Sequence, residues 1–420
     1  MMSAANEKTV GQNENVGSAR SVGSGRLKTL IPVMATFFVM GFVDLIGTAT
    51  NYVKVEFSLT DSIANLFTVM VFFWFLIFSV PTSMLMNRIG RRNTVLLSIV
   101  VTVGAMVLPV LAYVACPGGS TQRLVLIVAS FALLGIGNTL MQVSLNPLLT
   151  LFVKGDGLAS TLTAGQFIKT FASVFGPIIA GWGMSRFGSW WLLYAIYAVV
   201  GVLVGALLFF DKIEEEPARS GKTGIVECFK LLGNRAVLLC FIGIICHVGI
   251  DVCVNAQSPR ILMEHTNVPL TVAAGAASVF FAFRLIGCFT GSLVLSRISN
   301  RMGLLICGGL MVVASLGLAA FSLVSSNPPQ WLFYVCVAAI GFGNSNVFSL
   351  FLSNALLDQP DRQNEVSGLM MMGLIGGAIL PSIMGVASDA MGQFGGVLVV
   401  LAAAVYVLVI AIFHKAIESK

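Results

Sequence analysis

Charged residues are scarce in this sequence of 420 residues. Asp, Glu, Lys and Arg together supply 10% of the positions, whereas hydrophobic residues supply 57%. A water-soluble protein of this length carries far more charge on its surface. Polar stretches long enough to fold around a core of their own are also lacking. The composition therefore indicates an integral membrane protein and excludes a chain of several soluble domains.

The common catalytic motifs are missing as well. The chain has only three His, no HExxH motif, no Walker loop and no GxSxG nucleophile elbow, which excludes the usual metalloprotease, ATPase and hydrolase sites. We expect no enzymatic activity, no metal and no cofactor, so any transport must be driven by an ion gradient, and we predict the proton as the coupling ion. The net charge of +6 is scattered among loops and indicates membrane orientation, with no nucleic acid as a partner.

The eight cysteines contain no CxxC pair, and six of them fall in apolar stretches. We interpret them as free thiols that pack as small hydrophobic residues.

Apolar stretches long enough to cross a bilayer, about 20 residues each, recur along the chain. We predict twelve transmembrane helices, at 30–53, 62–86, 93–115, 122–153, 158–183, 190–210, 236–263, 271–296, 303–325, 330–357, 364–388 and 393–414. The polar residues 1–29 precede the first span and are interpreted as a disordered cytoplasmic tail. With both termini inside, 18 Lys and Arg fall on the cytoplasmic side and 4 outside, as the positive-inside rule requires.

The break at 211–235 divides the spans six and six. The halves also resemble one another: GPIIAG at 176–181 matches LPSIMG at 380–385, and Phe187-Gly188 matches Met391-Gly392. We predict an all-α membrane protein with an N-terminal bundle at 30–210, a cytoplasmic linker at 211–235, a C-terminal bundle at 236–414 and a tail at 415–420. In such parallel duplications the substrate site lies at the midplane between the halves.

Four charged residues fall near the middle of predicted spans: Asp44, Lys169, Asp251 and Arg284. Isolated charges in lipid are costly, so these are expected to pair and to share a polar cavity, with Asp44 near Lys169. His247 precedes Asp251 by one helical turn. Asp251 and Asp44 are candidate proton-coupling acids, and His247 is a third candidate. A static Asp251–Arg284 ion pair and a structural histidine are the alternatives.

Amide side chains accompany these charges at helical spacing. Steps of three or four residues place them on one face of a helix. The predicted substrate-binding residues are Lys169, Arg284, Gln142, Asn146, Asn138, Gln166, Asn255 and Asn344. Such a lining suits a hydroxyl-rich ligand, whose apolar faces aromatic residues such as Trp74, Phe280 or Phe281 would cover. The alternative is that the amides join helices by hydrogen bonds.

The loop between the second and third predicted spans, LMNRIGRR at 85–92, has a weaker repeat in LSRISNR at 295–301. It resembles the conserved cytoplasmic loop of the major facilitator superfamily, with Asn87 in place of the usual acid. The resemblance implies that the loop arginines hold the cytoplasmic side closed by contacting acids and helix carboxyl ends. The gating residues it implies are Asn87, Arg88, Gly90, Arg91, Arg92 and Arg297.

Several span motifs resemble the fucose permease branch of that superfamily, the fucose, galactose and glucose proton symporters. They are QVSLNP at 142–147, HVGIDV at 247–252, GCFTGS at 287–292 and GFGNS at 341–345. The chain departs from the branch where Gly47-Thr48 replaces Asn-Asp, Cys288 replaces Arg, Lys169 replaces Asn, and Gln142 is uncharged where fucose permeases carry Glu. Asp44 and Arg284 each lie about one turn from the expected position.

We therefore predict a secondary transporter that imports a monosaccharide or related sugar with protons by alternating access. The alternative is a transporter of acidic sugars or organic anions, whose carboxylate Lys169 and Arg284 would bind. A drug exporter is less consistent with a charged midplane, and a sensor would need a soluble domain. We expect a monomer in the lipid bilayer of a bacterial inner membrane.

Overall fold

The computed structural model describes residues 29–153, 157–211, 224–266, 275–324 and 328–417, together with 155, 213, 215, 268 and 273. These residues form helices and turns, and no strand occurs among them. The helices are residues 29–40, the 3₁₀-helix η1 (Gly41–Asp44), α2 (Leu45–Glu56), α3 (Asp61–Ile89), α4 (Arg91–Ala115), α5 (Thr121–Leu148), α6 (Gly157–Phe187), α7 (Leu192–Phe210), α8 (Ile225–Lys230), α9 (Arg235–Thr266), α11 (Gly275–Val294), α12 (Asn300–Leu323), α13 (Gln330–Asn344), α14 (Val347–Asp358), α15 (Gln363–Met372), the 3₁₀-helix η5 (Gly373–Ile375) and α16 (Gly376–Ile412).

Within the described residues, eleven helical segments are long and apolar enough to cross a bilayer. Only helices satisfy every backbone group within their own segment in lipid, which is why apolar runs of this length fold this way. The last segment, Pro360–Ile412, turns back at Gly392 and so contains two of the predicted spans. The predicted all-α fold with twelve spans is confirmed, although residues 1–28 and 418–420 of the predicted tails lie outside the described residues.

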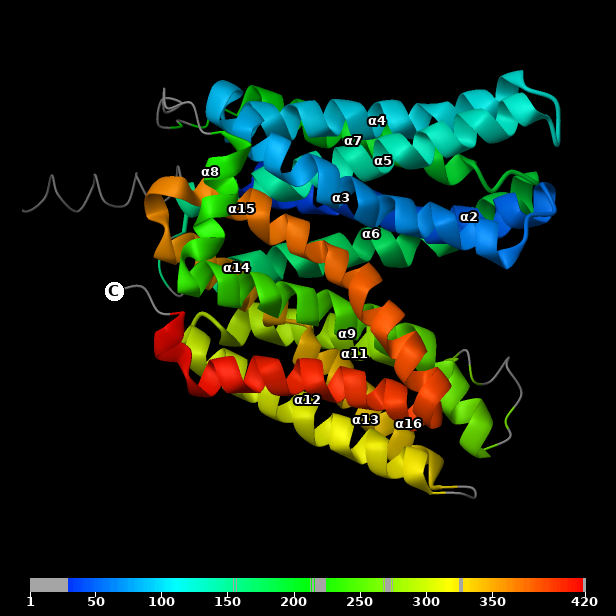
Figure 1. Ribbon diagram of the computed structural model, residues 1–420. Coiled ribbons are helices and arrows are strands. Elements are labelled where there is room, and N and C mark those ends of the chain that lie inside the picture. The colour runs from blue at the N-terminus through cyan, green and yellow to red at the C-terminus, as the bar shows by residue number, and fades with distance from the viewer. Residues whose placement is uncertain are drawn as a thin grey trace, which may run out of the picture.

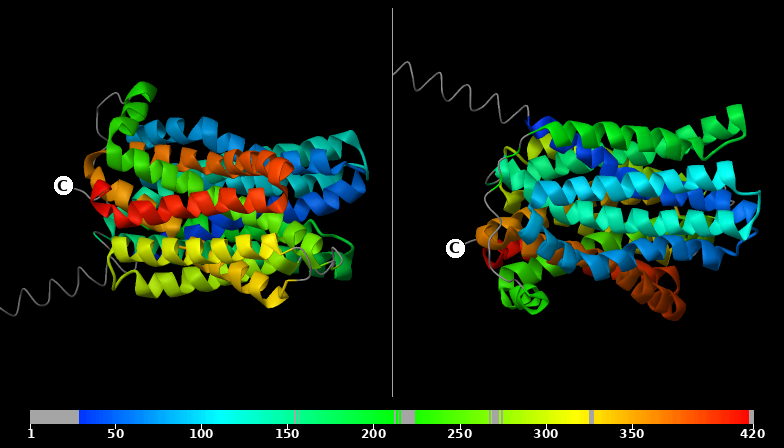
Figure 2. Two further views of the ribbon diagram at one scale, coloured as in Figure 1. Left: turned by 60° about the horizontal axis from the view of Figure 1, so that its bottom comes forward. Right: turned by 90° about the horizontal axis from the view of Figure 1, so that it is seen from above.

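The helices pack in two groups (Figures 1 and 2). The first contains the spans from residue 29 to α7, and the second contains α9 and the helices after it. The groups contact each other where α15 packs against α3 and α5, and where α6 packs against α11 and α14. The predicted linker contains one described helix, α8, which also contacts α3 and α15.

Both groups contain the same glycine turn. Gly188 (φ 64°) follows α6, and Gly392 (φ 66°) divides α16. A positive φ of this kind is strained for any residue with a Cβ. The two glycines are the ones that the sequence repeat aligns, so the internal repeat extends to backbone conformation.

We expect Gly392→Ala to lower the stability of the protein by about 1–3 kcal/mol, the usual cost of holding a residue other than glycine in a region such as φ 66°, ψ −163°. Gly385→Ala is the matched control, because a Cβ at Gly385, in the same helix, meets open space. Thermal unfolding in detergent measures the difference. Equal melting temperatures for the two variants would show that the turn relaxes without cost.

Two spans that the sequence predicts as continuous are interrupted in the structure. The tenth predicted span breaks at Ser345 and Asn346, between α13 and α14. The cause is the close approach of α11, since a Cβ at Gly287 would lie 2.3 Å from Ser345 Oγ, and Asn346 Nδ2 donates to the Gly287 carbonyl (3.2 Å). The first span changes to the 3₁₀-helix η1, which ends at Asp44. Breaks near functional polar residues are a recurring feature of transporters.

Candidate functional site

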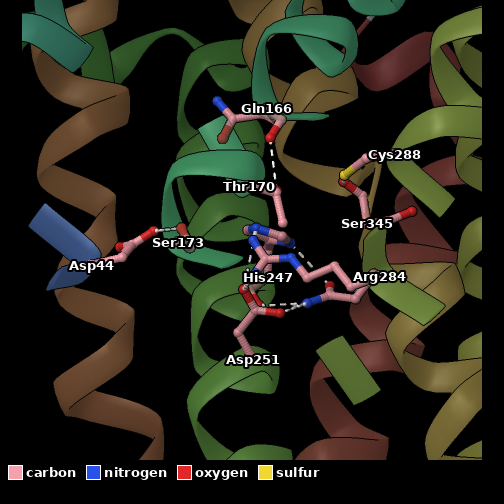
Figure 3. Close-up of polar contacts among 10 residues, drawn as sticks. Asp44, Gln166, Thr170, Ser173, His247, Asp251, Arg284, Cys288 and Ser345 are labelled. Atoms are coloured by element: carbon pink, nitrogen blue, oxygen red, sulfur yellow. Dashed lines mark hydrogen bonds and ion pairs between the residues drawn. The ribbon is translucent and has the colours of Figure 1, made fainter. Parts of the chain in front are cut away.

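An ion pair between α9 and α11 lies near the middle of both helices. Arg284 Nη1 donates to Asp251 Oδ2 at 2.6 Å, and the side chains are 32% and 12% exposed, respectively. Figure 3 shows the two side chains pointing toward each other, with His247 beside them. The Asp251–Arg284 ion pair, which the sequence left open as an alternative, is therefore present in this conformation. Because Arg284 is the more exposed partner, the guanidinium remains reachable from the solvent.

Asn344, at the end of α13, joins this pair to His247. Its Nδ2 donates to Asp251 Oδ1 (2.8 Å) and to the His247 carbonyl (3.0 Å), and its Oδ1 lies 3.0 Å from His247 Nδ1. His247 Nε2 lies 4.0 Å from Asp251 Oδ2, and the imidazole is buried. Three helices thus hold one carboxylate between an arginine, an amide and an imidazole.

Asp44 belongs to a second polar pair. Ser173 Oγ of α6 donates to Asp44 Oδ2 at 2.5 Å, and Asp44 is exposed. Figure 3 shows this pair to one side of Asp251 and Arg284. The first span approaches α6 closely here, since a Cβ at Gly41 would lie 2.5 Å from the Lys169 carbonyl oxygen.

The pairing of Asp44 with Lys169 that we predicted does not form. Lys169 makes no ion pair within the described part of the chain. Asp44 instead lies level with Ser173, one helical turn after Lys169. Asp251 and Arg284 therefore pair with each other, and Asp44 pairs with a hydroxyl beside it.

The amide face of α5 is buried. Asn138, Gln142 and Asn146 are each less than a tenth exposed. Asn146 Nδ2 donates to the Gln142 carbonyl at 2.7 Å, while the Oδ1 atoms of Asn138 and Asn146 have no partner among the described residues. Unpartnered buried acceptors are rare in proteins. They favour ligand or water contacts over a purely structural role for this face.

Two further predicted residues lie in different environments. Gln166 of α6 has a buried Nε2 without a partner in the described structure, whereas Asn255 of α9 is exposed. Of the aromatic candidates, Phe280 is fully buried and so packs in the core, but Phe281 is exposed. The buried Trp74 Nε1 likewise lacks a partner in the described residues.

The loop after α3 connects the two helix groups at one end of the molecule, which we call the closed end (residues 87–92 and 363–367). Asn87 Nδ2 donates to Glu365 Oε1 (2.9 Å), and Asn364 Nδ2 donates to Asn87 Oδ1 (2.7 Å). Asn87 can donate to an acid across the interface, which the acid usual at this position could not do. Ser367 Oγ extends the contact by donating to the Val143 carbonyl (2.7 Å).

Arg91 is the centre of the closed end. Its guanidinium donates to Asn364 Oδ1 (2.6 Å), Gln363 Oε1 (3.2 Å) and the Pro147 carbonyl (2.8 Å). Arg92 donates to the Phe209 carbonyl (2.7 Å) near the carboxyl end of α7. These contacts have the geometry that the gating resemblance implies. The turn is closed by Gly90, whose φ of 87° requires glycine.

For two predicted gating residues, Arg88 and Arg297, the described residues show no contact between the groups, and both side chains are exposed. Sequence reasoning missed the acceptors, which are Glu215, Gln363, Asn364 and Glu365. Glu215 accepts from the backbone N–H groups of Arg91 (2.7 Å) and Arg92 (2.5 Å). A run of polar residues at the start of an apolar span was the available signal for α15.

Comparisons with known proteins identify the family and the fold of this chain. A family profile described as Major Facilitator Superfamily matches residues 33–381. The glucose/galactose transporter of Brucella abortus is 26% identical over 374 residues, which cover 85% of this chain and 86% of that protein. Among solved structures, FucP, the fucose:proton symporter of E. coli, in the outward conformation has a TM-score of 0.76 with 17% identity, covering 94% of this chain and 100% of FucP.

The proton:xylose symporter XylE has a TM-score of 0.67 with 13% identity, and the match covers 93% of this chain and 95% of XylE. The similarity to both structures confirms the predicted fold. The profile match confirms the prediction of a multi-pass membrane transporter rather than an enzyme. Extending over most of the membrane region, it also agrees with the loop motif at 85–92, and the chain belongs to the Major Facilitator Superfamily.

Proposed function

We propose that this protein is a secondary transporter that imports a neutral monosaccharide together with a proton. The observation that carries the proposal is the polar cluster of Asp251, Arg284, Asn344 and His247, which α9, α11 and the end of α13 in the second helix group form near the middle of α9 and α11. A carboxylate at this depth has a cost in lipid that is offset by its partners, and such residues mark ion and substrate pathways. The relative from Brucella abortus is named a glucose/galactose transporter, and FucP and XylE are named proton symporters.

A neutral sugar fits the charge balance of the site. Asp251 and Arg284 neutralise each other, and the α5 face offers amides, which donate to and accept from hydroxyl groups. An acidic sugar would need two free cations to bind its carboxylate as we envisaged. Arg284 is engaged by Asp251 in this conformation, and the similar proteins are named for neutral sugars, glucose/galactose and fucose, so this alternative is the weaker one.

In alternating access, the closed end is the part of the protein that blocks the pathway on one side of the membrane. Hydrogen bonds between the helix groups lie around Asn87 and Arg91, and most basic loop residues lie at this end. The positive-inside rule places it in the cytoplasm, with both termini inside. The conformation is then open toward the outside, and we assign the protein to a bacterial inner membrane as a monomer.

Reconstitution into liposomes that contain a pH-sensitive dye tests the substrate and the ion together. Addition of glucose or galactose to the outside should acidify the lumen, whereas the corresponding uronic acids, glucuronate and galacturonate, should not. A protonophore should abolish the signal, and substitution of sodium by choline should leave it unchanged. Uptake of a neutral hexose that requires sodium would reject the proton as coupling ion. Acidification by the uronic acids alone would favour the anion transporter.

A further inference from the structure

Asn344 determines which nitrogen of His247 carries a hydrogen. Asn344 Nδ2 contacts Asp251 Oδ1 and the His247 carbonyl, and both of these atoms are acceptors. A flipped amide would place an oxygen against two oxygens, so the orientation of Asn344 is fixed. Its Oδ1 can only accept, and it lies 3.0 Å from His247 Nδ1. The neutral imidazole therefore carries its hydrogen on Nδ1.

The lone pair of His247 is consequently on Nε2, the nitrogen nearer to Asp251. Nε2 lies 4.0 Å from Asp251 Oδ2, and the His247 side chain is 3% exposed. Two acceptors that face each other without a hydrogen between them repel, and the low dielectric of the interior strengthens the repulsion. One proton on Nε2 would replace the repulsion by a charge-assisted hydrogen bond.

Among the described residues that surround His247, Asp251 is the other group that could take up that proton. The charged groups that act on the imidazole are Asp251 on its own helix and Arg284 on α11. From α13 it meets the amide of Asn344, and from α14 the ring of Phe348, with 5.9 Å between ring centroids. On the α16 side the neighbour of α9 is the apolar Leu380, which packs on Gly249.

A proton on His247 also changes the position of Arg284. Arg284 Nη1 already donates to the carboxylate oxygen that faces His247 Nε2, namely Asp251 Oδ2, at 2.6 Å. With a protonated imidazole, two cations compete for one carboxylate. Arg284 is 32% exposed and His247 only 3%, so the arginine is the partner that has room to turn away from Asp251.

We propose that Nε2 of His247 takes up the transported proton, and that Asp251 then exchanges its partner from Arg284 to His247, which frees the Arg284 guanidinium to bind sugar hydroxyls. This inference rests on the proposed function and names the proton-binding atom within it. The proton adds to the Nε2 lone pair from the outer solution, and it leaves to the inner solution when Arg284 returns to Asp251. The N–H bond that forms at Nε2 on proton uptake breaks on release, and one positive charge crosses with each sugar.

Nitrogen NMR tests the tautomer without any transport assay. The chain has three His, so the variant His265→Gln with His414→Gln retains His247 alone for ¹⁵N-imidazole labelling. At neutral pH we expect a protonated Nδ1 and an unprotonated Nε2, and acidification should convert Nε2 to the protonated form. A hydrogen on Nε2 of the neutral ring would overturn the proposal, as would an imidazole that stays neutral over the pH range in which protons are transported.

His247→Asn tests the coupling. The Asn amide nitrogen replaces Nδ1 as donor to Asn344, but nothing replaces Nε2. Liposomes with this variant should lose sugar-driven acidification and uphill accumulation, and sugar counterflow should slow as well, because Arg284 stays bound to Asp251. Acidification equal to that of the wild type would overturn the role of His247. If the wild type itself moves sugar without protons, the proposed function fails, while the NMR result still decides the tautomer.

Discussion

Asp251→Asn is expected to abolish uphill accumulation of sugar while sugar exchange across the membrane persists. The Asn side chain has nearly the shape of Asp, and its oxygen can still accept from Arg284 or Asn344. It carries no charge, so it can neither hold Arg284 as an ion pair nor attract a protonated His247. Without the exchange of partners, proton binding and sugar binding are no longer linked, and linkage is what gives coupling its free energy.

Radiolabelled sugar uptake into liposomes under a proton gradient measures this loss. A coupling of only about 1.4 kcal/mol corresponds to a tenfold change in accumulation, so the effect should be at least tenfold. Glu264→Gln is the matched control, because it removes the same charge from the exposed outer part of the same helix, α9. If the sugar accumulated by Asp251→Asn is within a factor of about two of that accumulated by the control, Asp251 has no role in coupling.

The ion pair between Asp251 and Arg284 also contributes to the thermal stability of the protein. Arg284→Gln leaves Asp251 without its cation, and breaking a buried pair in this way costs about 3–5 kcal/mol. We expect less, about 1–3 kcal/mol, because Arg284 is 32% exposed and water screens the charge. The double variant Asp251→Asn with Arg284→Gln should recover most of the loss in thermal unfolding. A double variant as unstable as the single one would show that packing rather than charge pairing is responsible.

Arg91→Ala should open the closed end and shift the protein from the outward-open toward the inward-open conformation. Arg91 donates to Asn364, Gln363 and the Pro147 carbonyl, and a hydrogen bond from a charged group contributes about 1.5–3 kcal/mol. Even one such contribution changes the ratio of two conformations by about tenfold or more. Transport should slow because the outward state is then rarely populated.

Cys228 of α8 reports this opening. It is buried beside Ser83 of α3, with 3.8 Å between Sγ and Oγ, and burial raises the pKa of the Cys228 thiol, so little reactive thiolate forms at neutral pH. In a Cys116→Ser background, Arg91→Ala should raise the maleimide labelling rate of Cys228 about tenfold. Arg88→Ala is the control, since it removes the same charge from an exposed side chain of the same loop. Equal rates in both variants would contradict a gating role for Arg91.

The loop motif shows how far sequence reasoning reaches. The spacing in LMNRIGRR places a glycine turn before two arginines, of which Arg91 contacts the other helix group and Arg92 the carboxyl end of α7 in its own group. It could not distinguish Arg91 and Arg92 from Arg88, because exposure depends on how α3 is rotated about its axis. Nor could it identify Glu365 as the partner of Asn87, since the two residues are distant in sequence and meet only when the groups close.

Hydropathy by itself determined the membrane location, the number of spans and their approximate bounds, because twenty consecutive apolar residues have no other stable environment than lipid or protein. The repeat of Gly188 at Gly392 determined the position of both reverse turns, because only glycine adopts that backbone conformation without strain. Both are local properties of a segment.

Only the tertiary structure decided which charges pair. From sequence, Asp44, Lys169, Asp251 and Arg284 were equivalent midplane charges, and the structure pairs Asp251 with Arg284, gives Asp44 a hydroxyl partner in Ser173, and leaves Lys169 outside any ion pair in the described residues. It also places Asn344 between Asp251 and His247. Rotation and depth of a helix are set by packing against its neighbours rather than by its own apolar length, so no single span encodes them.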